Sequence, residues 1–263
     1  MKIAVVIFPG TNCEDETRYV LGERFGQQVD LVWHRDTDLA GYDCVVLPGG
    51  FSYGDHLRAG AIARFSPVMG AVAEAARRDV LVVGICNGFQ ILCEAGLLPG
   101  TLLPNAGGTF LSTWVHCGVE TDDSPLTRGI ETRRVLRLPI AHGEGRYVAD
   151  PDVLARIERN GQVILRYSDA AGQVTEAANP NGSVAHIAGI VSEGGNVVGL
   201  MPHPERAADP EMSSQDGIPL LDALTRWKGR ATLDAPVAVG AASGGTVSGG
   251  TVHAGAARRS RPA

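Results

Sequence analysis

The chain has 263 residues, of which 44% are apolar and 20% are charged, and its formal net charge is −6. This length suffices for one large domain, or two small ones, with a buried core. The mildly acidic balance argues against a nucleic-acid binder, which presents a basic surface. The longest apolar run, at residues 80–86, is far shorter than the ~18–20 residues that span a bilayer. The N-terminus also lacks the cleavage site of a signal peptide, so we expect a cytoplasmic protein without a membrane anchor.

Short apolar, β-branched runs alternate with helical patterns along the first hundred residues. In chain order they predict a strand at 3–8, a helix at 14–25, strands at 29–33 and 44–47, a helix at 67–78, a strand at 80–85 and a helix at 88–94. Strands that alternate with helices predict an α/β fold of three layers. We expect a doubly wound, mostly parallel sheet with helices on both faces.

The middle of the chain is less regular. Strands are expected at 113–120, 135–140 and 162–167, as an antiparallel extension of the sheet, with a short helix at 152–160. A late strand at 197–201 and a helix at 218–227 complete the predicted domain, residues 1–228. Residues 229–263 are mostly Ala, Gly, Ser, Thr and Val without periodicity, and they predict a disordered tail.

The five cysteines are odd in number and none forms a C-x-x-C pair, so neither a disulfide framework nor a structural zinc site is expected. Reduced thiols fit the cytoplasm. Nor do the histidines show metal-ligand spacing, and we assign no metal.

Cys86 lies in the segment Gly84-Ile85-Cys86-Asn87-Gly88, where a strand ends and a helix begins. Gly-x-Cys-x-Gly at such a turn is the cysteine form of a nucleophile elbow. The turn exposes the side chain at the carboxyl end of the sheet, and the helix N-terminus favours a thiolate. A buried cysteine with packing glycines would give the same pattern.

Two further segments supply candidate partners for this thiol. His203 and Glu205, in Met-Pro-His-Pro-Glu at 201–205, point the same way along an extended segment, so Glu205 could orient the imidazole of a general base. The glycines of Leu-Pro-Gly-Gly-Phe at 47–51 could offer a backbone amide to an oxyanion. Taken alone, each segment is equally typical of an ordinary turn.

The three segments, in this order, resemble a class I glutamine amidotransferase, whose flavodoxin-like fold matches the predicted one. Four segments narrow the resemblance to the glutaminase subunits of phosphoribosylformylglycinamidine synthase, an enzyme of purine biosynthesis. They are FPGTNC at 8–13, GFSYGD at 50–55, CNGFQ at 86–90 and IAHGEGR at 140–146. The resemblance covers roughly residues 1–227.

The resemblance implies a triad of nucleophile, general base and acid, and orienting carboxylate, formed by Cys86, His203 and Glu205. It implies that the backbone amides of Gly50 and Asn87 form the oxyanion hole and that Gly50 and Gln90 bind L-glutamine. The thiolate would form a glutamyl thioester and release ammonia, and water would then hydrolyse the thioester.

The resemblance also implies partners. No phosphate-binding G-x-x-x-x-G-K-[ST] motif is present, so ATP and Mg are expected on a separate, large synthetase subunit, and no cofactor on this chain. That subunit would convert formylglycinamide ribonucleotide to formylglycinamidine ribonucleotide, and a small subunit would bridge the two. The predicted partner-facing loop consists of His142, Gly143, Glu144, Gly145 and Arg146.

Several alternatives stay open. His142, with Glu144 two residues on, is a rival for the general base, and Cys13, near a helix start, is a rival thiol without a base nearby in the sequence. The chain could instead be a stand-alone γ-glutamyl cysteine hydrolase of the same fold. It could also be a non-catalytic interaction subunit.

Overall fold

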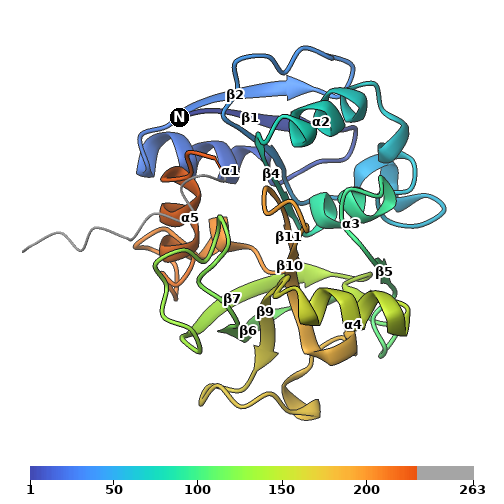
Figure 1. Cartoon of the computed structure of the whole chain (residues 1–263), viewed down its shortest axis with the longest axis vertical. Coiled ribbons are helices and arrows are strands. Elements are labelled where there is room, and N and C mark those ends of the chain that lie inside the picture. The colour runs from blue at the N-terminus through green and yellow to red at the C-terminus, as the bar shows by residue number, and fades with distance from the viewer. Residues whose placement is uncertain (230–263) are drawn as a thin grey trace, which may run out of the picture.

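The computed structural model describes residues 1–229, so the predicted tail at 229–263 lies outside the described residues except for Gly229. A nine-stranded sheet with the strand order β2-β1-β3-β4-β11-β10-β9-β6-β7 forms the centre of the described part (Figure 1). Five neighbouring strands run parallel: β1 (Lys2–Ile7), β2 (Gln28–Trp33), β3 (Cys44–Leu47), β4 (Leu81–Ile85) and β11 (Val197–Leu200). Their order, 2-1-3-4-5 along the chain, is that of flavodoxin-like sheets, as predicted.

The other four strands form an antiparallel half, so the sheet is mixed rather than mostly parallel. They are β6 (Leu111–Val119), β7 (Val135–His142), β9 (Val163–Ser168) and β10 (Ile187–Val191). The antiparallel pairing of β10 with β11 follows from their short connection, residues 192–196, because a parallel crossover needs about a dozen or more residues. A separate pair, β5 (Thr101–Leu103) and β8 (Arg146–Val148), and strand β10 were not predicted.

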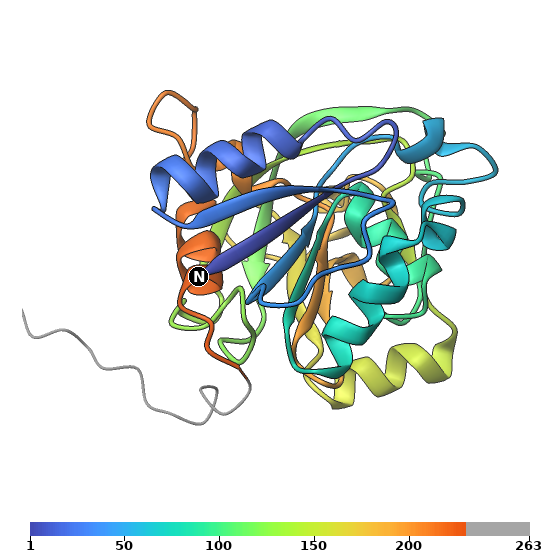
Figure 2. The same cartoon turned by 90° about the horizontal axis from the view of Figure 1, so that it is seen from above.

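Helices cover both faces of the sheet, as predicted. Figures 1 and 2 show α1 (Glu14–Tyr19) and α5 (Ile218–Thr225) on one side, and α2 (Val68–Arg77), α3 (Asn87–Glu94) and α4 (Pro151–Arg159) on the other. The predicted first helix continues beyond α1 as a π-helical turn over Val20–Arg24. No helix within residues 1–229 is long and apolar enough to cross a membrane.

The parallel half determines where the candidate site lies. Strands β3, β4 and β11 are buried at every residue, and the register pairs Leu47 with Gly84 and Ile85 with Leu200. The three strands therefore end at the same edge of the sheet. The segments that follow them, together with the one that follows β1, meet at this edge, which is where α/β sheets bind their ligands.

Candidate active site

Cys86 occupies the predicted turn between β4 and α3. Its backbone has φ 50° and ψ −104°, a region that residues other than glycine rarely adopt. Cys86 directly precedes the first residue of α3. A Cβ atom on Gly88 would overlap the carbonyl group of Leu47, and one on Gly84 would lie 2.6 Å from the backbone of Gly88. Both glycines are thus required for the close approach of strand and helix, and the strained backbone presents the thiol at the sheet edge.

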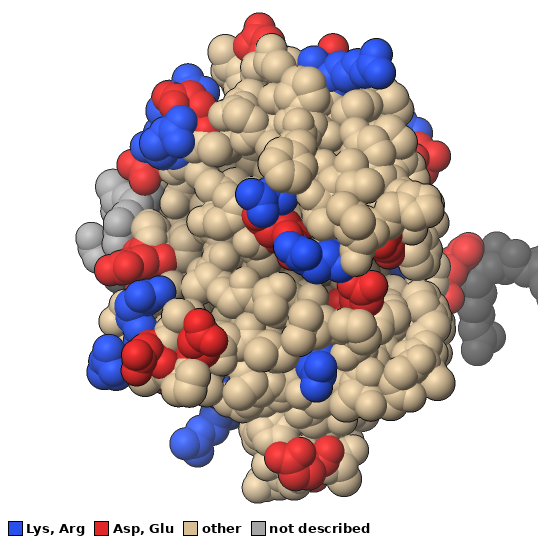
Figure 3. Space-filling view, turned by 90° about the vertical axis from the view of Figure 1, so that its right-hand side faces the viewer, with Lys and Arg blue, Asp and Glu red and all other residues tan. Residues whose placement is uncertain are grey.

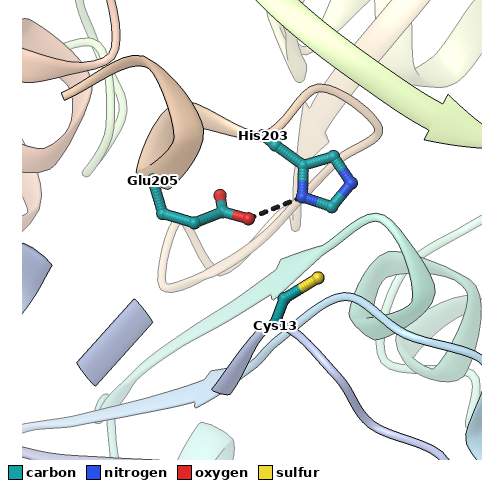
Figure 4. A group of neighbouring side chains, drawn as sticks. All are labelled: Cys13, His203 and Glu205. Carbon is teal, nitrogen blue, oxygen red and sulfur yellow. Dashed lines mark hydrogen bonds and ion pairs between the residues drawn. The ribbon is translucent and has the colours of Figure 1, made fainter. Parts of the chain in front are cut away.

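His203 and Glu205 form a buried pair directly after β11. Nδ1 of His203 lies 2.5 Å from Oε1 of Glu205, and both side chains are almost fully buried (Figure 4). The backbone N–H of His203 donates to the carbonyl oxygen of Pro139 at 2.9 Å, and a 3-10 turn over Pro204–Ala207 returns Glu205 toward the ring. The proton on Nδ1 is held by the carboxylate, which leaves Nε2 as the reactive nitrogen.

The environment of His203 favours its protonated form. Burial by itself would lower the pKa of His203, but the Glu205 carboxylate, together with Cys86 and Cys13, raises that pKa well above its usual value. Nε2 is buried and has no hydrogen-bond partner among the described residues. The imidazole can therefore hold a proton beside a thiol and pass it on.

Cys13 is the residue that the sequence did not connect with this site. It lies in the segment after β1, 190 positions from His203, and yet its thiol lies next to the imidazole (Figure 4). Burial raises the pKa of the Cys13 thiol, and the neighbouring His203 lowers it only in part. Gly49 makes room for the pair, because a Cβ there would lie 2.6 Å from the ring and 2.9 Å from the sulfur.

Cys13, His203 and Glu205 also have the composition of a metal site, since their donor atoms all lie within 4.8 Å of one another. Two contacts oppose this use. Nη2 of Arg206 lies 3.1 Å from the sulfur of Cys13, and the short His203–Glu205 bond occupies the facing nitrogen and oxygen. The arrangement suits a proton relay better than a cation.

The loop after β3 is folded back onto the segment after β1. The N–H of Phe51 donates to the carbonyl oxygen of Gly10 at 2.8 Å, and Gly50 has φ 153°. The backbone N–H groups of Gly50 and Asn87 have no acceptor among residues 1–229. Two free amide donors near a nucleophile elbow are what an oxyanion hole requires.

Gln90 is held inside the protein, one helical turn after Cys86. Its Nε2 donates to the carbonyl oxygen of Glu144 at 2.6 Å, and its Oε1 accepts from Asn87 Nδ2 at 2.9 Å. The side chain is 5% exposed and its rotamer is fixed by these bonds. A small cavity of about 140 Å³, lined by Ala141 and His203 among others, leads to the histidine from the β7 side.

The segment 142–146, which the sequence predicted to face a partner, is packed largely inside the chain. His142 and Gly145 are buried, while Gly143, Glu144 and Arg146 are half-buried. His142 ends strand β7, and its Nδ1 donates to Oδ1 of Asn105 at 3.1 Å, because that oxygen can only accept. Packing against Asn105 covers His142 and Gly145 in the free chain, and their contact with a partner stays a prediction. Partner contact through the other three stays a prediction too.

His142 is also a poor rival for the general base. Burial, and then the charge on His203, lower the pKa of His142 to about 4, so it is neutral near pH 7. Its ring packs directly over Gly145, where any Cβ would overlap it. Asn105, which also accepts the N–H of Gly145 at 2.9 Å, is a structural residue that the sequence analysis missed.

Comparison with known proteins agrees with this geometry. Residues 1–219 match the family model described as CobB/CobQ-like glutamine amidotransferase domain, and the chain belongs to this family of glutamine amidotransferases. The chain is 54% identical over 227 residues to phosphoribosylformylglycinamidine synthase subunit PurQ of Moorella thermoacetica, covering 86% of this chain and 96% of the relative. It is also 54% identical over 221 residues to the PurQ subunit of Thermomicrobium roseum, covering 84% of this chain and 94% of that relative.

A solved structure shares both the fold and the sequence. One chain of the structure of PurLQS from Thermotoga maritima aligns with a TM-score of 0.76 and 42% identity, over 85% of this chain and 97% of that one. Together with the named relatives, this similarity places the chain among the PurQ subunits, which are glutamine amidotransferases. The family resemblance read from the sequence is confirmed.

Proposed function

We propose that this chain hydrolyses L-glutamine to glutamate and ammonia through a thioester on Cys86. The observation that carries the proposal is the position of His203, bonded to Glu205 through Nδ1 and with Nε2 free beside the thiol. The Cys86 sulfur attacks the side-chain amide carbon of glutamine, and the C=O π electrons move to oxygen. The C–N bond then breaks as His203 gives its proton to the departing nitrogen, and ammonia leaves.

Hydrolysis reverses the proton path. His203 takes a proton from water, the resulting hydroxide attacks the thioester carbon, and the C–S bond breaks to release glutamate and the thiolate. Glu205 keeps the imidazole in one orientation and stabilises its charged form, which the raised pKa of His203 supports. In both steps the backbone N–H groups of Gly50 and Asn87 are the donors that would stabilise the negative oxygen.

The ammonia is used by a second protein. The solved relative is part of an assembly named PurLQS, and the named relatives are synthase subunits, which supports a chain that works with other subunits. We assign ATP, Mg and formylglycinamide ribonucleotide to a large synthetase subunit, and a bridging role to a small third subunit. The five cysteines are unpaired, which supports the cytoplasm as the location.

The surface suited to the synthetase is an apolar rim around the loop after β3. Leu57 is 89% exposed, Phe65 is 76% exposed, and Phe51 lies with its ring 6.1 Å from that of Phe110, both about half exposed. This loop lies on the right in Figure 1 and so belongs to the face in Figure 3, where wide uncharged areas surround a central group of charged residues and further charged residues lie toward the edges. Phe51 directly follows Gly50, so a partner seated on the rim would cover the loop that carries one of the proposed oxyanion donors.

The test is a comparison of nitrogen donors in the assembled synthase. Cys86→Ala should abolish glutamine-dependent synthesis and leave ammonia-dependent synthesis nearly unchanged, because only the first uses the thiol. Glutamine use that persists in Cys86→Ala would refute the assignment. Neither a stand-alone γ-glutamyl hydrolase nor a non-catalytic subunit is favoured, since the relatives are synthase subunits and the triad side chains lie together.

A further inference from the structure

The side chain of Asn87 bridges the two halves of the presumed oxyanion hole. It is 1% exposed and lies at the first position of α3, directly after Cys86. Its Oδ1 accepts the backbone N–H of Ser52 at 3.0 Å, and its Nδ2 donates to Gln90 Oε1 at 2.9 Å. The same Nδ2 lies 3.4 Å from Oδ1 of Asp55. One amide group therefore connects the elbow to the loop that carries Gly50.

That loop needs such a connection, because its backbone is strained. Tyr53, Asp55 and Leu57 have φ of 54°, 51° and 72°, although none of them is glycine. Left-handed backbone is sterically unfavourable for L-residues. The conformation persists only where surrounding bonds fix it. The bond from Ser52, with the longer contact from Asp55, fixes the loop to Asn87 in the elbow, whereas the bond from Tyr53 fixes it to Pro9.

A second connection runs through Glu144. Its carbonyl oxygen accepts from Gln90, and its carboxylate Oε2 accepts the backbone N–H of Ala59 at 3.0 Å. The far end of the loop is thereby fixed to the segment after β7, and the near end to Asn87. Gly50 lies two residues before the near point, Ser52.

We propose that the Asn87 side chain is a positioning residue, which places the Gly50 amide relative to the Asn87 amide so that both can donate to one oxyanion. This inference rests on the proposed function and extends it, because the family resemblance involves only the backbone of Asn87. Without the side-chain bond the strained loop relaxes, and the Gly50 amide moves away from the elbow. The thiol itself is unaffected, since its position is determined by β4 and α3.

The test separates oxyanion formation from thiol reactivity, using Asn87→Ala in the assembled synthase. We expect the kcat for glutamine hydrolysis to fall about 10²-fold, the scale of one lost oxyanion donor. Glutamate γ-semialdehyde is an aldehyde analogue of glutamine, and addition of the Cys86 sulfur to its carbonyl carbon places a negative charge on the oxygen. Its affinity should therefore fall by a similar factor. Alkylation of Cys86 by iodoacetamide, which forms no oxyanion, should keep its rate.

Asn196→Ala is the matched control. Asn196 is also buried, and its Nδ2 donates to the carbonyl oxygens of Ala76 and Val80, away from the site. This variant should lose thermal stability and keep kcat. Asn87→Leu has nearly the same shape but no acceptor for the Ser52 N–H, so it should show the same loss of kcat, and it replaces Asn87→Ala if the alanine form does not fold.

Two results would overturn the inference. One is a kcat that stays within about threefold of the parent in Asn87→Ala, well under the 10²-fold loss of an oxyanion donor. The other is a kcat and an alkylation rate that fall together, which would mean that the elbow itself has moved. Failure of the proposed function is distinguishable, because it would appear as glutamine hydrolysis that persists in Cys86→Ala.

Discussion

Nη2 of Arg206 donates to the thiol of Cys13 over 3.1 Å, while the residue before it, Glu205, bonds the imidazole that this thiol adjoins. Arg206 also pairs with Glu16 at 3.0 Å, which holds the guanidinium in place. Two thiols thus lie beside one histidine in different surroundings. Cys13 is covered by a guanidinium, and Cys86 lies on a strained turn at the start of a helix.

The first prediction follows from this difference. Cys13→Ala should retain glutamine hydrolysis within about threefold, whereas Cys86→Ala should lose at least about 10³-fold, the scale of removing a nucleophile. The reason is that Cys13 lacks the strained turn at a helix start and the adjoining free amides that the reaction needs. Steady-state release of ammonia from glutamine measures both variants.

A glutamine-mimicking electrophile provides the control, with the modified peptide identified by mass spectrometry. Label on the peptide that contains Cys86 agrees with the assignment. If the label appears instead on the peptide that contains Cys13, the two thiols have been given the wrong roles.

The second prediction concerns pH and His142. Its pKa is about 4 in the folded protein and about 6.5 unfolded, so unfolding takes up a proton below pH 6.5. The contribution of His142 to the free energy of unfolding is fully present above pH 6.5. It declines as the pH falls toward 4, by up to about 1.4 kcal/mol per pH unit. His142→Gln should therefore be less stable than the parent near neutral pH, and that difference should shrink in acid.

Asp55 works in the opposite direction and has to be separated from this effect. Burial and then Glu144 raise the pKa of the Asp55 carboxyl to about 6, so its contribution favours folding as pH falls from 6 toward its unfolded value. Subtracting the urea-unfolding free energies of His142→Gln from those of the parent, pH by pH, cancels Asp55. Parallel curves for the two proteins would rule out the His142 account.

The third prediction compares two glycines in helices. Gly88→Ala should destabilise the fold by about 1–3 kcal/mol or more, because its Cβ would overlap backbone atoms of Leu47 that cannot move aside. Gly70→Ala, in α2 with open space around it, should stabilise by about 0.5–1 kcal/mol. Chemical denaturation of both variants and of the parent measures these changes in the free energy of unfolding. Equal effects would mean that the close approach of α3 to β3 is unimportant.

The fourth prediction concerns the apolar rim. Leu57→Glu should weaken assembly with the synthetase by tenfold or more while leaving the fold intact, because an 89% exposed side chain stabilises nothing in the free chain. Met212→Glu is the control, since Met212 is also exposed but lies on a different part of the chain, beside Asp209 and Pro210. Titration with the synthetase subunit measures both, and equal affinities would place the docking surface elsewhere.

The sequence predicted the parallel half of the fold well, because buried strands and capped helices leave strong local patterns. It missed β10, whose five residues around Gly189 carry no periodicity beyond a short apolar run. At the site, the segments around Cys86 and His203 were recognisable from their own residues. The contacts of Cys13 and Asn105 were not, because both depend on chain segments far apart in the sequence that meet only when the sheet forms.

Within residues 1–229, strand β11 is the last strand in the sequence, and yet it lies in the middle of the sheet, between β4 and β10. A nascent or truncated chain that ends before it has the nucleophile but neither His203 nor Glu205. The two halves of the sheet then have no common strand to join them. Glutamine hydrolysis by the proposed triad therefore requires synthesis of the chain through β11 to Glu205, and a shorter copy cannot hydrolyse glutamine by this route.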